Sequence, residues 1–248
     1  VAVSNQRESV VAWDGRDGTP LGPVIGWQDS RTADFCRSIA TPDNERLVHE
    51  RTGLRIDPMF SAPKMRLLHD ALPRTGAGGR ARIGTIDTWL VAMLTGQRVY
   101  AAEAGNASRT LLLDTAACDW DEELCALFGV PRGALAPVAR SDGGFGVSAG
   151  SGAIPAGVPV VSVLGDSHAA LFGHGCRAPG EGKATYGTGS SVMVAAGPRR
   201  PAGGAATLAW LTGEPFYGLE GNIVWAGSAM DWVARLLGVG PGRELDEL

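Results

Sequence analysis

The chain has 248 residues, of which 44% are hydrophobic and 19% charged, and its formal net charge is −4. These values are typical of a folded globular protein and exclude a disordered chain. They also argue against nucleic acid as a partner, because phosphate contacts need clustered Lys and Arg. No apolar run approaches the ~20 residues of a membrane-spanning helix, and residues 1–7 lack the basic and apolar regions of a signal peptide. We therefore expect no membrane partner.

The cysteines and histidines do not form a metal-binding pattern. The four histidines neither form H-x-x-x-H nor cluster with acidic residues, and no cysteine pair has C-x-x-C spacing among Cys36, Cys118, Cys125 and Cys176. We therefore expect no metal held by protein ligands. Reduced, mostly buried thiols in a cytoplasmic protein are the expected state of these cysteines.

The first half of the chain reads as strands followed by helices. Residues 1–7 and 9–14 alternate as strands do, with a turn at 15–18. Apolar residues then recur at helical spacing, which predicts helices over residues 32–40, 60–72, 85–94 and 121–128.

The second half begins with a loop rich in Gly, Ser and Ala over residues 141–157. An apolar run at 158–164 predicts a buried strand, and a helix follows at 167–172. The glycine-rich stretch 173–182 is the best candidate for a domain junction. Beyond it we predict strands at 184–186, 192–196, 206–210 and 216–219 and a helix at 226–237. Mixed strands and helices on this scale predict an α/β fold.

Asp166 lies where the predicted buried strand ends and a helix begins. In open α/β sheets, ligands bind at the carboxyl ends of strands, and a carboxylate there can take a proton from a substrate hydroxyl. An Asp that only caps the following helix fits the same pattern. Taken alone, the pattern favours the cap.

Two further patterns are weak when each is taken alone. Residues 186–191 form a strand followed by a turn rich in glycine and hydroxyl groups, whose backbone N–H groups can hold a phosphate, although any tight hairpin looks similar. Arg7 and Glu8 place a donor beside a carboxylate, and such a pair can hold adjacent hydroxyls. A surface ion pair is the commoner explanation for the second pattern.

Taken together and in order, these segments resemble the FGGY family of carbohydrate kinases, and within it the glycerol kinase branch. The matches are colinear over essentially the whole chain, which makes the resemblance specific. They comprise Ser4-Asn5-Gln6-Arg7-Glu8 and residues 25–32, 53–64, 84–90, 106–110, 165–173, 186–189 and 226–232.

The resemblance implies an actin/hexokinase-like (ribonuclease H-like) two-domain kinase fold. Residues 1–174 would be the rest of the N-terminal domain, with the substrate site and catalytic base. Residues 175–248 would start the C-terminal domain, on the nucleotide side. The implied activity is transfer of a phosphoryl group from ATP, with Mg²⁺, to a hydroxyl of glycerol or a related small polyol or sugar.

The resemblance also assigns roles to individual residues. Asp166 would be the general base, Arg7 and Glu8 would hold substrate hydroxyls, and Trp27 would lie against the carbon skeleton of the substrate. The nucleotide would be contacted by Gly187, Thr188, Gly189, Gly227 and Asp231.

Three positions depart from the glycerol kinase pattern. Met59 stands in place of a Tyr, Ser167 in place of a Gln, and Ser191 in place of a Phe. A pocket that loses this volume holds glycerol poorly, because small ligands bind tightly when most of their surface is buried. We therefore expect a larger polyol or sugar, or loose specificity, with Met59 and Ser167 still contacting the substrate.

The family's N-terminal D-x-G-T-T segment and C-terminal adenosine-binding segment have no match here, so both domains are expected to be incomplete. Phosphoryl transfer depends on positioning and charge neutralisation, so we expect negligible kinase activity from these 248 residues alone. The alternative is a non-catalytic actin-like module that binds nucleotide or a partner. A homodimer is left open.

A hydrolase built on Ser167 and His168 is a poor third interpretation. Adjacent helical residues point in different directions and cannot form the hydrogen bond between nucleophile and base that such an enzyme needs.

Overall fold

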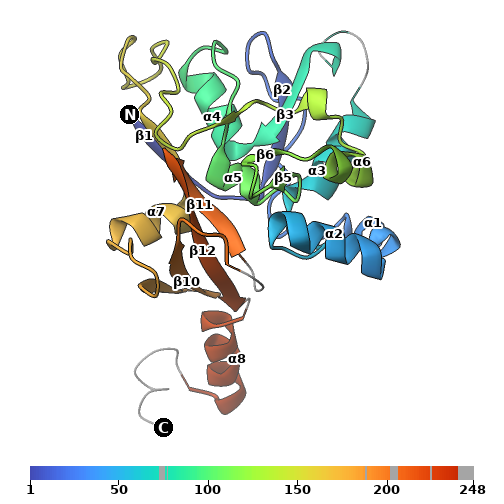
Figure 1. Cartoon of the computed structure of the whole chain (residues 1–248), viewed down its shortest axis with the longest axis vertical. Helices are drawn as coiled ribbons and strands as arrows, with labels where there is room; N and C mark the ends of the chain where they lie inside the picture. The colour runs from blue at the N-terminus through green and yellow to red at the C-terminus, as the bar shows by residue number, and fades with distance from the viewer. Residues whose placement is uncertain (73–75, 77, 188, 202–205, 224, 240–248) are drawn as a thin grey trace.

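A computed structural model describes residues 1–72, 76, 78–187, 189–201, 206–223 and 225–239. Its larger part contains the short helices and strands of the first half of the chain, and a smaller part below it contains a second sheet (Figure 1). Within these ranges no helix is both long and apolar enough to cross a bilayer.

The strand pair β1 (Ala2–Asn5) and β8 (Ser162–Gly165) positions the site. The two strands run parallel, with Ala2 opposite Ser162 and Asn5 opposite Gly165. Because parallel strands end at the same edge, the residues that follow them emerge side by side. The segment after Asn5 and the segment after Gly165 therefore meet, although they are far apart in the sequence.

The strand predicted at 158–164 is shorter and later than expected. Pro159 has no N–H, and the N–H of Val160 is bonded to the carbonyl of Gly146 rather than to a strand. Val160 is nevertheless fully buried. The apolar run therefore predicted burial correctly, but the prediction of where the strand begins was wrong.

A second strand pair lies in the larger part. Strand β2 (Val10–Asp14) is buried along its whole length and pairs antiparallel with β3 (Ala81–Thr85), which the sequence pattern had not predicted. Helix α3 (Ser61–Ala71) packs against this pair, and helix α4 (Ile86–Leu94) also packs against β1 and β8.

The remaining α-helices and strands of the larger part enclose its main apolar core, and short 3₁₀ helices lie at Gly78–Arg80 and Arg132–Ala134. The predicted helices at 32–40 and 121–128 are present within one or two residues, whereas two others had not been predicted. The elements are α1 (Ala33–Ile39), α2 (Pro42–Thr52), β4 (Ala102–Glu103), α5 (Ala104–Ser108), β5 (Leu113–Asp114), β6 (Asp119–Trp120), α6 (Glu122–Phe128) and β7 (Val138–Ala139).

Helix α7 (Asp166–Gly173) leads into the second sheet, and residues 174–181 between them form neither helix nor strand. The sheet is antiparallel, in the order β11-β12-β10-β9. All four predicted strands are present and longer than expected: β9 (Gly182–Tyr186), β10 (Ser190–Gly197), β11 (Ala206–Thr212) and β12 (Glu214–Ile223). The sheet packs against α7 through contacts that include Leu171 and the stacked rings of Trp210 and Phe216.

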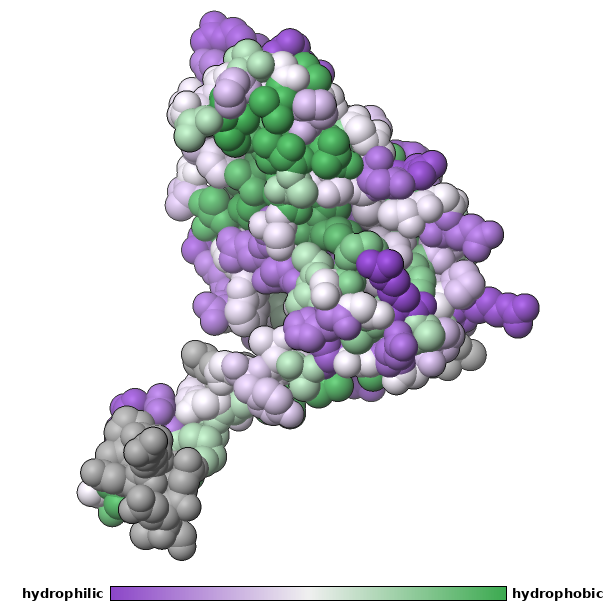
Figure 2. Space-filling view, turned by 90° about the vertical axis from the view of Figure 1, so that its left-hand side faces the viewer, coloured by the Kyte–Doolittle hydropathy of each residue, from purple (hydrophilic) through white to green (hydrophobic). Residues whose placement is uncertain are grey.

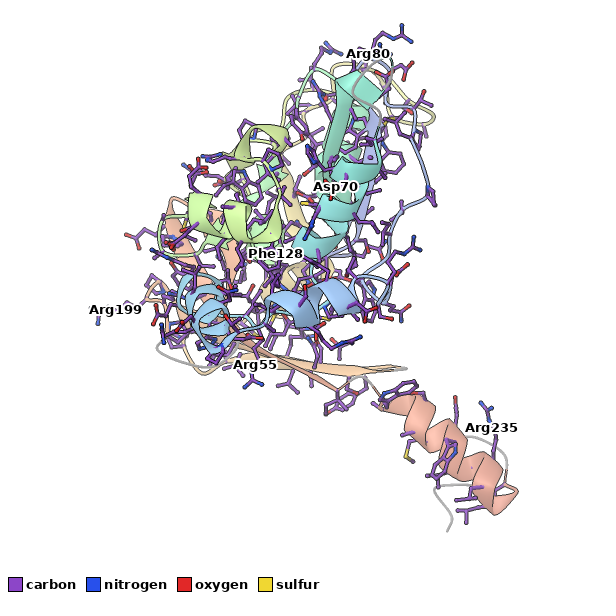
Figure 3. The ribbon with its side chains drawn as sticks, turned by 90° about the vertical axis from the view of Figure 1, so that its right-hand side faces the viewer. Arg55, Asp70, Arg80, Phe128, Arg199 and Arg235 are labelled. Carbon is purple, nitrogen blue, oxygen red and sulfur yellow. The ribbon has the colours of Figure 1, made fainter. Side chains whose placement is uncertain are left out.

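Helix α8 (Gly227–Leu237) stands away from the rest of the molecule (Figures 1 and 3), and Arg235 lies toward its far end. The space-filling view shows the same projecting arm below the main body, whose upper part carries a broad apolar surface (Figure 2). Met230, Trp232 and Leu236 on α8 are each more than half exposed. Only Ala234 of this helix is buried.

Candidate active site

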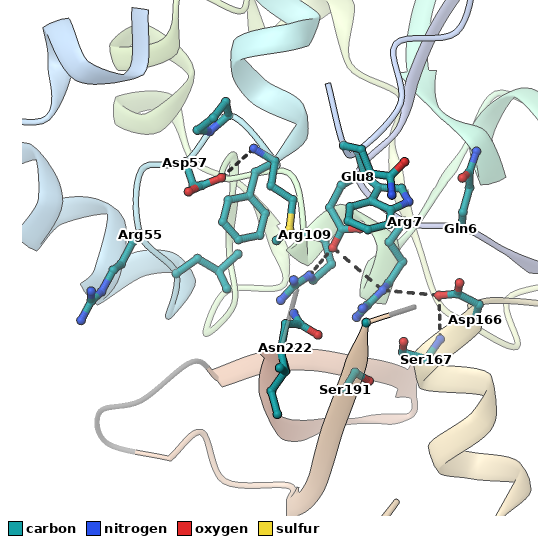
Figure 4. A pocket seen from close by; sticks show the side chains of 18 of the residues that line it. Gln6, Arg7, Glu8, Arg55, Asp57, Arg109, Asp166, Ser167, Ser191 and Asn222 are labelled. Atoms are coloured by element: carbon teal, nitrogen blue, oxygen red, sulfur yellow. Dashed lines mark hydrogen bonds and ion pairs between the residues drawn. The ribbon is translucent and has the colours of Figure 1, made fainter. Parts of the chain in front are cut away.

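A cavity of about 1180 Å³ lies between the ends of β1 and β8 and the second sheet (Figure 4). Residues from both parts of the chain line it. They include Gln6, Arg7, Glu8, Trp27, Asp29, Arg55, Asp57, Met59, Arg109, Asp166, Ser167, Thr185, Gly189, Ser190, Ser191, Asn222 and Trp225. This volume is slightly above the usual range for small-molecule sites, ~300–1,000 Å³, and accommodates more than one small ligand.

Arg7 follows β1 and is almost completely buried, with 7% of its side chain exposed. Its terminal nitrogens donate to the carboxylate of Glu220, Nη1 to Oε2 at 2.9 Å and Nη2 to Oε1 at 2.6 Å. Its Nε has no hydrogen-bond partner among the described residues. This nitrogen lies 3.9 Å from Oε1 of Glu8 and 3.7 Å from Oδ1 of Asp166. A buried donor without a hydrogen-bond partner in the described part of the chain therefore lies close to two carboxylates.

Glu8 is held in an unusual backbone conformation, with φ of +62°. For a residue other than glycine this costs ~1–3 kcal/mol, and it persists only where neighbouring groups impose it. Here the hydroxyl of Ser61 donates to the carbonyl of Glu8, and Nε of Arg109 donates to its Oε1 at 2.7 Å. These bonds turn the Glu8 side chain into the cavity.

Asp166 is the first residue of α7, and its side chain is 59% exposed. The cap position of the helix belongs to Gly165, so the interpretation of Asp166 as the cap is wrong. Oδ1 of Asp166 accepts the N–H of Ser167 at 2.7 Å and faces Nε of Arg7. The carboxylate is thus oriented by its neighbours and still open to the cavity.

Buried charges surround Arg7. Burial alone would lower the pKa of Arg7, but the negative charges of Glu220 and Glu8 outweigh it and raise the pKa. Burial would raise the pKa of Glu220, but the positive charges of Arg109 and Arg7 hold it well below its usual value. Burial and the charge of Arg7 keep the pKa of His168 well below its ordinary value. His168 is therefore neutral, and Nε2 accepts from Nη1 of Arg7 at 3.1 Å.

Trp27 and Met59 also line the cavity. Trp27 is 39% exposed, and its backbone N–H donates to Oγ of Ser9. The segment around Met59 is held by Lys64, whose ammonium group donates to the carbonyls of Met59 and Phe60. Burial lowers the pKa of Lys64 to about 8.

The residues expected on the nucleotide side are only partly gathered at the cavity. Gly189 lines it, and the N–H of Gly227 donates to the carbonyl of Gly187 at 2.9 Å, which joins two of the expected segments. Gly187 and Gly227 do not line the cavity themselves, and Asp231 is exposed on α8. Thr188 lies outside the described residues.

Comparisons with known proteins identify the family. A profile of the FGGY family of carbohydrate kinases, N-terminal domain, matches residues 1–173. The chain belongs to this family. An apulose kinase of Pectobacterium atrosepticum is 44% identical to this FGGY chain, and a glycerol kinase of Geobacter sp. (strain M21) is 43% identical. Each alignment covers 100% of the chain and 51% or 52% of the relative. The FGGY chain thus spans about half the length of the curated relatives it matches.

Solved structures show the same fold. The crystal structure of Plasmodium falciparum glycerol kinase with ADP has a TM-score of 0.85 and 31% identity, and the match covers 94% of this FGGY chain and 48% of that one. A xylulose kinase from Rhodospirillum rubrum, 24% identical, has a TM-score of 0.81 with coverage of 96% and 48% and shares the fold. The expected actin/hexokinase-like fold is confirmed.

Two residues of the FGGY site were missed in the sequence. Arg109 lies in a matched segment but had no role assigned to it, and it now bonds Glu8 and lines the cavity. Glu220 belongs to no local motif, and only the fold brings it from β12 to Arg7. No local pattern distinguished Glu220, because only Tyr217 and Gly218 are buried with it in β12.

In the described part of the FGGY chain, no three His, Cys, Asp or Glu residues form a metal-ligand cluster.

Proposed function

We propose that the complete gene product containing this chain phosphorylates a hydroxyl of glycerol or a related small polyol or sugar with ATP. The observation that carries this proposal is the Nε of Arg7, which is unpaired within the described residues and lies close to the carboxylates of Glu8 and Asp166. A hydroxyl both accepts and donates hydrogen bonds, so it matches a buried N–H donor placed next to two acceptors.

In this proposal the attacking hydroxyl accepts a hydrogen bond from Arg7 and donates one to Asp166. Asp166 takes the proton as the hydroxyl oxygen bonds to the γ-phosphorus and the bond from that phosphorus to the β,γ-bridging oxygen breaks. The products are the phosphorylated polyol and ADP. A positioned base contributes ~10²–10⁴ in rate, so positioning and charge neutralisation supply the rest.

Glu8 accepts a hydrogen bond from a second hydroxyl of the substrate, and Trp27 lies against the carbon skeleton of the substrate. Met59, Ser167 and Ser191 all line the cavity, and their small or flexible side chains leave room beyond a three-carbon substrate. We therefore propose that the preferred substrate is larger than glycerol. The names of the relatives, apulose kinase and glycerol kinase, agree with this chemical class.

On the donor side we propose that Gly187, Thr188 and Gly189 contact the ATP phosphates and that Gly227 and Asp231 meet the nucleotide. Glycines let phosphate oxygens approach backbone N–H groups closely. Mg²⁺, held mainly by the phosphates, would neutralise their charge. Residues 1–174 then form the substrate side and residues 175–248 begin the nucleotide side.

The test is an ATP-dependent assay of the complete gene product on glycerol, tetritols and pentoses. Replacing Asp166 by Asn should reduce kcat by ~10²–10⁴ and leave the KM for ATP nearly unchanged. The matched control is Asp34→Asn, because Asp34 is an exposed aspartate of α1 paired with Arg37. Nucleotide binding without turnover of any acceptor would favour the non-catalytic module. Strong preference for glycerol would refute the proposed substrate size.

A further inference from the structure

Glu220 lies in β12 beneath the cavity and does not line it. Only 1% of its side chain is exposed, yet it carries a full negative charge between two arginines. Both of its oxygens accept hydrogen bonds from the fork of Arg7, meaning the two terminal nitrogens Nη1 and Nη2. Oε2 also lies 3.3 Å from Nη1 of Arg109. One carboxylate of the second sheet therefore holds two arginines that line the cavity from the other part of the chain.

The two hydrogen bonds to Glu220 determine which nitrogen of Arg7 is directed toward Glu8 and Asp166. A guanidinium is planar, so two parallel bonds to one carboxylate fix its orientation as well as its position. With Nη1 and Nη2 directed at Glu220, the remaining donor Nε points toward Glu8 and Asp166. The stem of Arg7 lies over Gly165, which leaves it little room to turn.

Without Glu220, two other carboxylates near the guanidinium of Arg7 would be available to form an ion pair with it. Asp166 is 3.7 Å and Glu8 is 3.9 Å from Nε, both close enough for a rotated fork to pair with them. Such a pair would occupy the carboxylate that must receive the proton of the substrate. The charged and titratable groups around this position are Arg7, Glu8, Arg109, Asp166, His168, Lys183 and Glu220.

We propose that Glu220 is a positioning residue of the phosphoryl-transfer site, which directs Nε of Arg7 toward the substrate hydroxyl and keeps the fork of Arg7 away from Asp166. This inference rests on the proposed function. It also means that the substrate site is complete only when β12 is docked against the ends of β1 and β8, because Glu220 comes from the second sheet.

The experiment compares Glu220→Gln, Glu220→Asp and the control Glu214→Gln in the complete gene product. Glu214 is an exposed glutamate at the start of the same strand. Glutamine keeps the size of the side chain but turns an amide N–H₂ group toward the guanidinium, whereas aspartate keeps the charge. Steady-state kinetics with the best polyol and with ATP, and the melting temperature, are measured for each.

We expect Glu220→Gln to lower kcat/KM for the polyol by ~10- to 100-fold, as for other residues that hold a binding residue in place. The KM for ATP should change by less than about twofold. Glu220→Asp should recover part of the loss, and Glu214→Gln should behave like wild type. The Glu220→Gln loss should also be smaller in an Arg7→Lys background, because the residue acts through Arg7.

The outcomes separate this inference from the proposed function. If wild type phosphorylates no polyol, the proposed function fails and the role of Glu220 fails with it. If wild type is active but Glu220→Gln matches Glu214→Gln, or its loss multiplies fully with that of Arg7→Lys, only the role of Glu220 is refuted. A lower melting temperature with an unchanged KM for the polyol would show a merely structural role. Should Glu220→Gln not fold, Glu220→Asp takes its place in the same comparison.

Discussion

Gly165 sets the path of Arg7. It ends β8, one residue before Asp166, and a Cβ atom placed on it would lie 2.6 Å from both Cγ and Cδ of Arg7. Because the far end of Arg7 is held by Glu220, its stem cannot move aside freely. Glycine at this position is therefore required by a close contact and not by a turn.

Replacing Gly165 by Ala should displace Arg7 and lower kcat/KM for the polyol by ~10-fold or more, because small displacements of a positioning group are costly in active sites. The control is Gly173→Ala at the other end of α7, where a Cβ would meet no atom within 4 Å. Steady-state kinetics of both variants make the comparison. Equal activity of the two would contradict the importance of this contact.

Helix α2 shows how a helix end is placed against the second sheet. The helix is preceded by its N-cap Thr41, whose side chain accepts a hydrogen bond from the N–H of Asn44, and is followed by its C-cap Gly53 with φ of +77°. A Cβ on Gly53 would lie 2.4 Å from the carbonyl oxygen of Ala206 at the start of β11. Gly53 is thus constrained both by its own backbone and by a neighbouring strand.

We expect Gly53→Ala to lower the free energy of unfolding by about 2–4 kcal/mol, which combines left-handed strain with overlap in a packed contact. Gly129→Ala is the matched control, because Gly129 is the C-cap of α6 with φ of +67°, but the atoms nearest to a Cβ there are in the Arg66 side chain, at 3.6 Å. That variant should lose only about 1–2 kcal/mol, the cost of strain. Urea unfolding of both measures the difference. Equal losses would mean that β11 moves to accommodate the added Cβ atom, which would contradict the prediction.

Sequence periodicity predicted most elements well where one face meets the core. The helices at 60–72 and 85–94 appear as α3 and α4 within one residue at either end. Helix α2 was missed because only Val48 and Thr52 of its residues are buried, so its apolar pattern is weak. Its Thr41-Pro42 start was a usable signal that the apolar pattern did not include.

At the scale of the whole molecule, a buried carboxylate joins the two parts. Glu103 accepts the N–H groups of Gly105 and Asn106 and the hydroxyl of Ser141, and Oγ of Ser141 accepts the N–H of Leu211 in β11. Burial raises the pKa of Glu103 from 4.5 to about 7. The folded protein therefore binds this proton more tightly than the unfolded chain does.

Stability contributed by this proton is fully present below about pH 4.5 and is lost as the pH rises through about 7, on the order of 3 kcal/mol in total. Glu103→Gln should therefore flatten the fall in unfolding free energy between about pH 5 and about pH 8. Its stability at any one pH should be lower, because an amide N–H₂ replaces an acceptor. Urea unfolding of wild type, Glu103→Gln and the exposed control Glu50→Gln tests the slope. An unchanged slope in Glu103→Gln would contradict the prediction.

The sequence by itself determined the α/β class, the family and the segments from which the cavity is built. These follow from local patterns and from the order of motifs along the chain, as with Asp166 after an apolar run and Arg7 after a strand. Tertiary structure alone decided that Arg7 directs Nε toward Asp166, that Glu220 holds its fork, and that Gly165 and Gly53 leave no room for a side chain. The physical reason is that each of these contacts joins residues far apart in the chain, and their distance and orientation are set by strand pairing and packing, which no local pattern encodes.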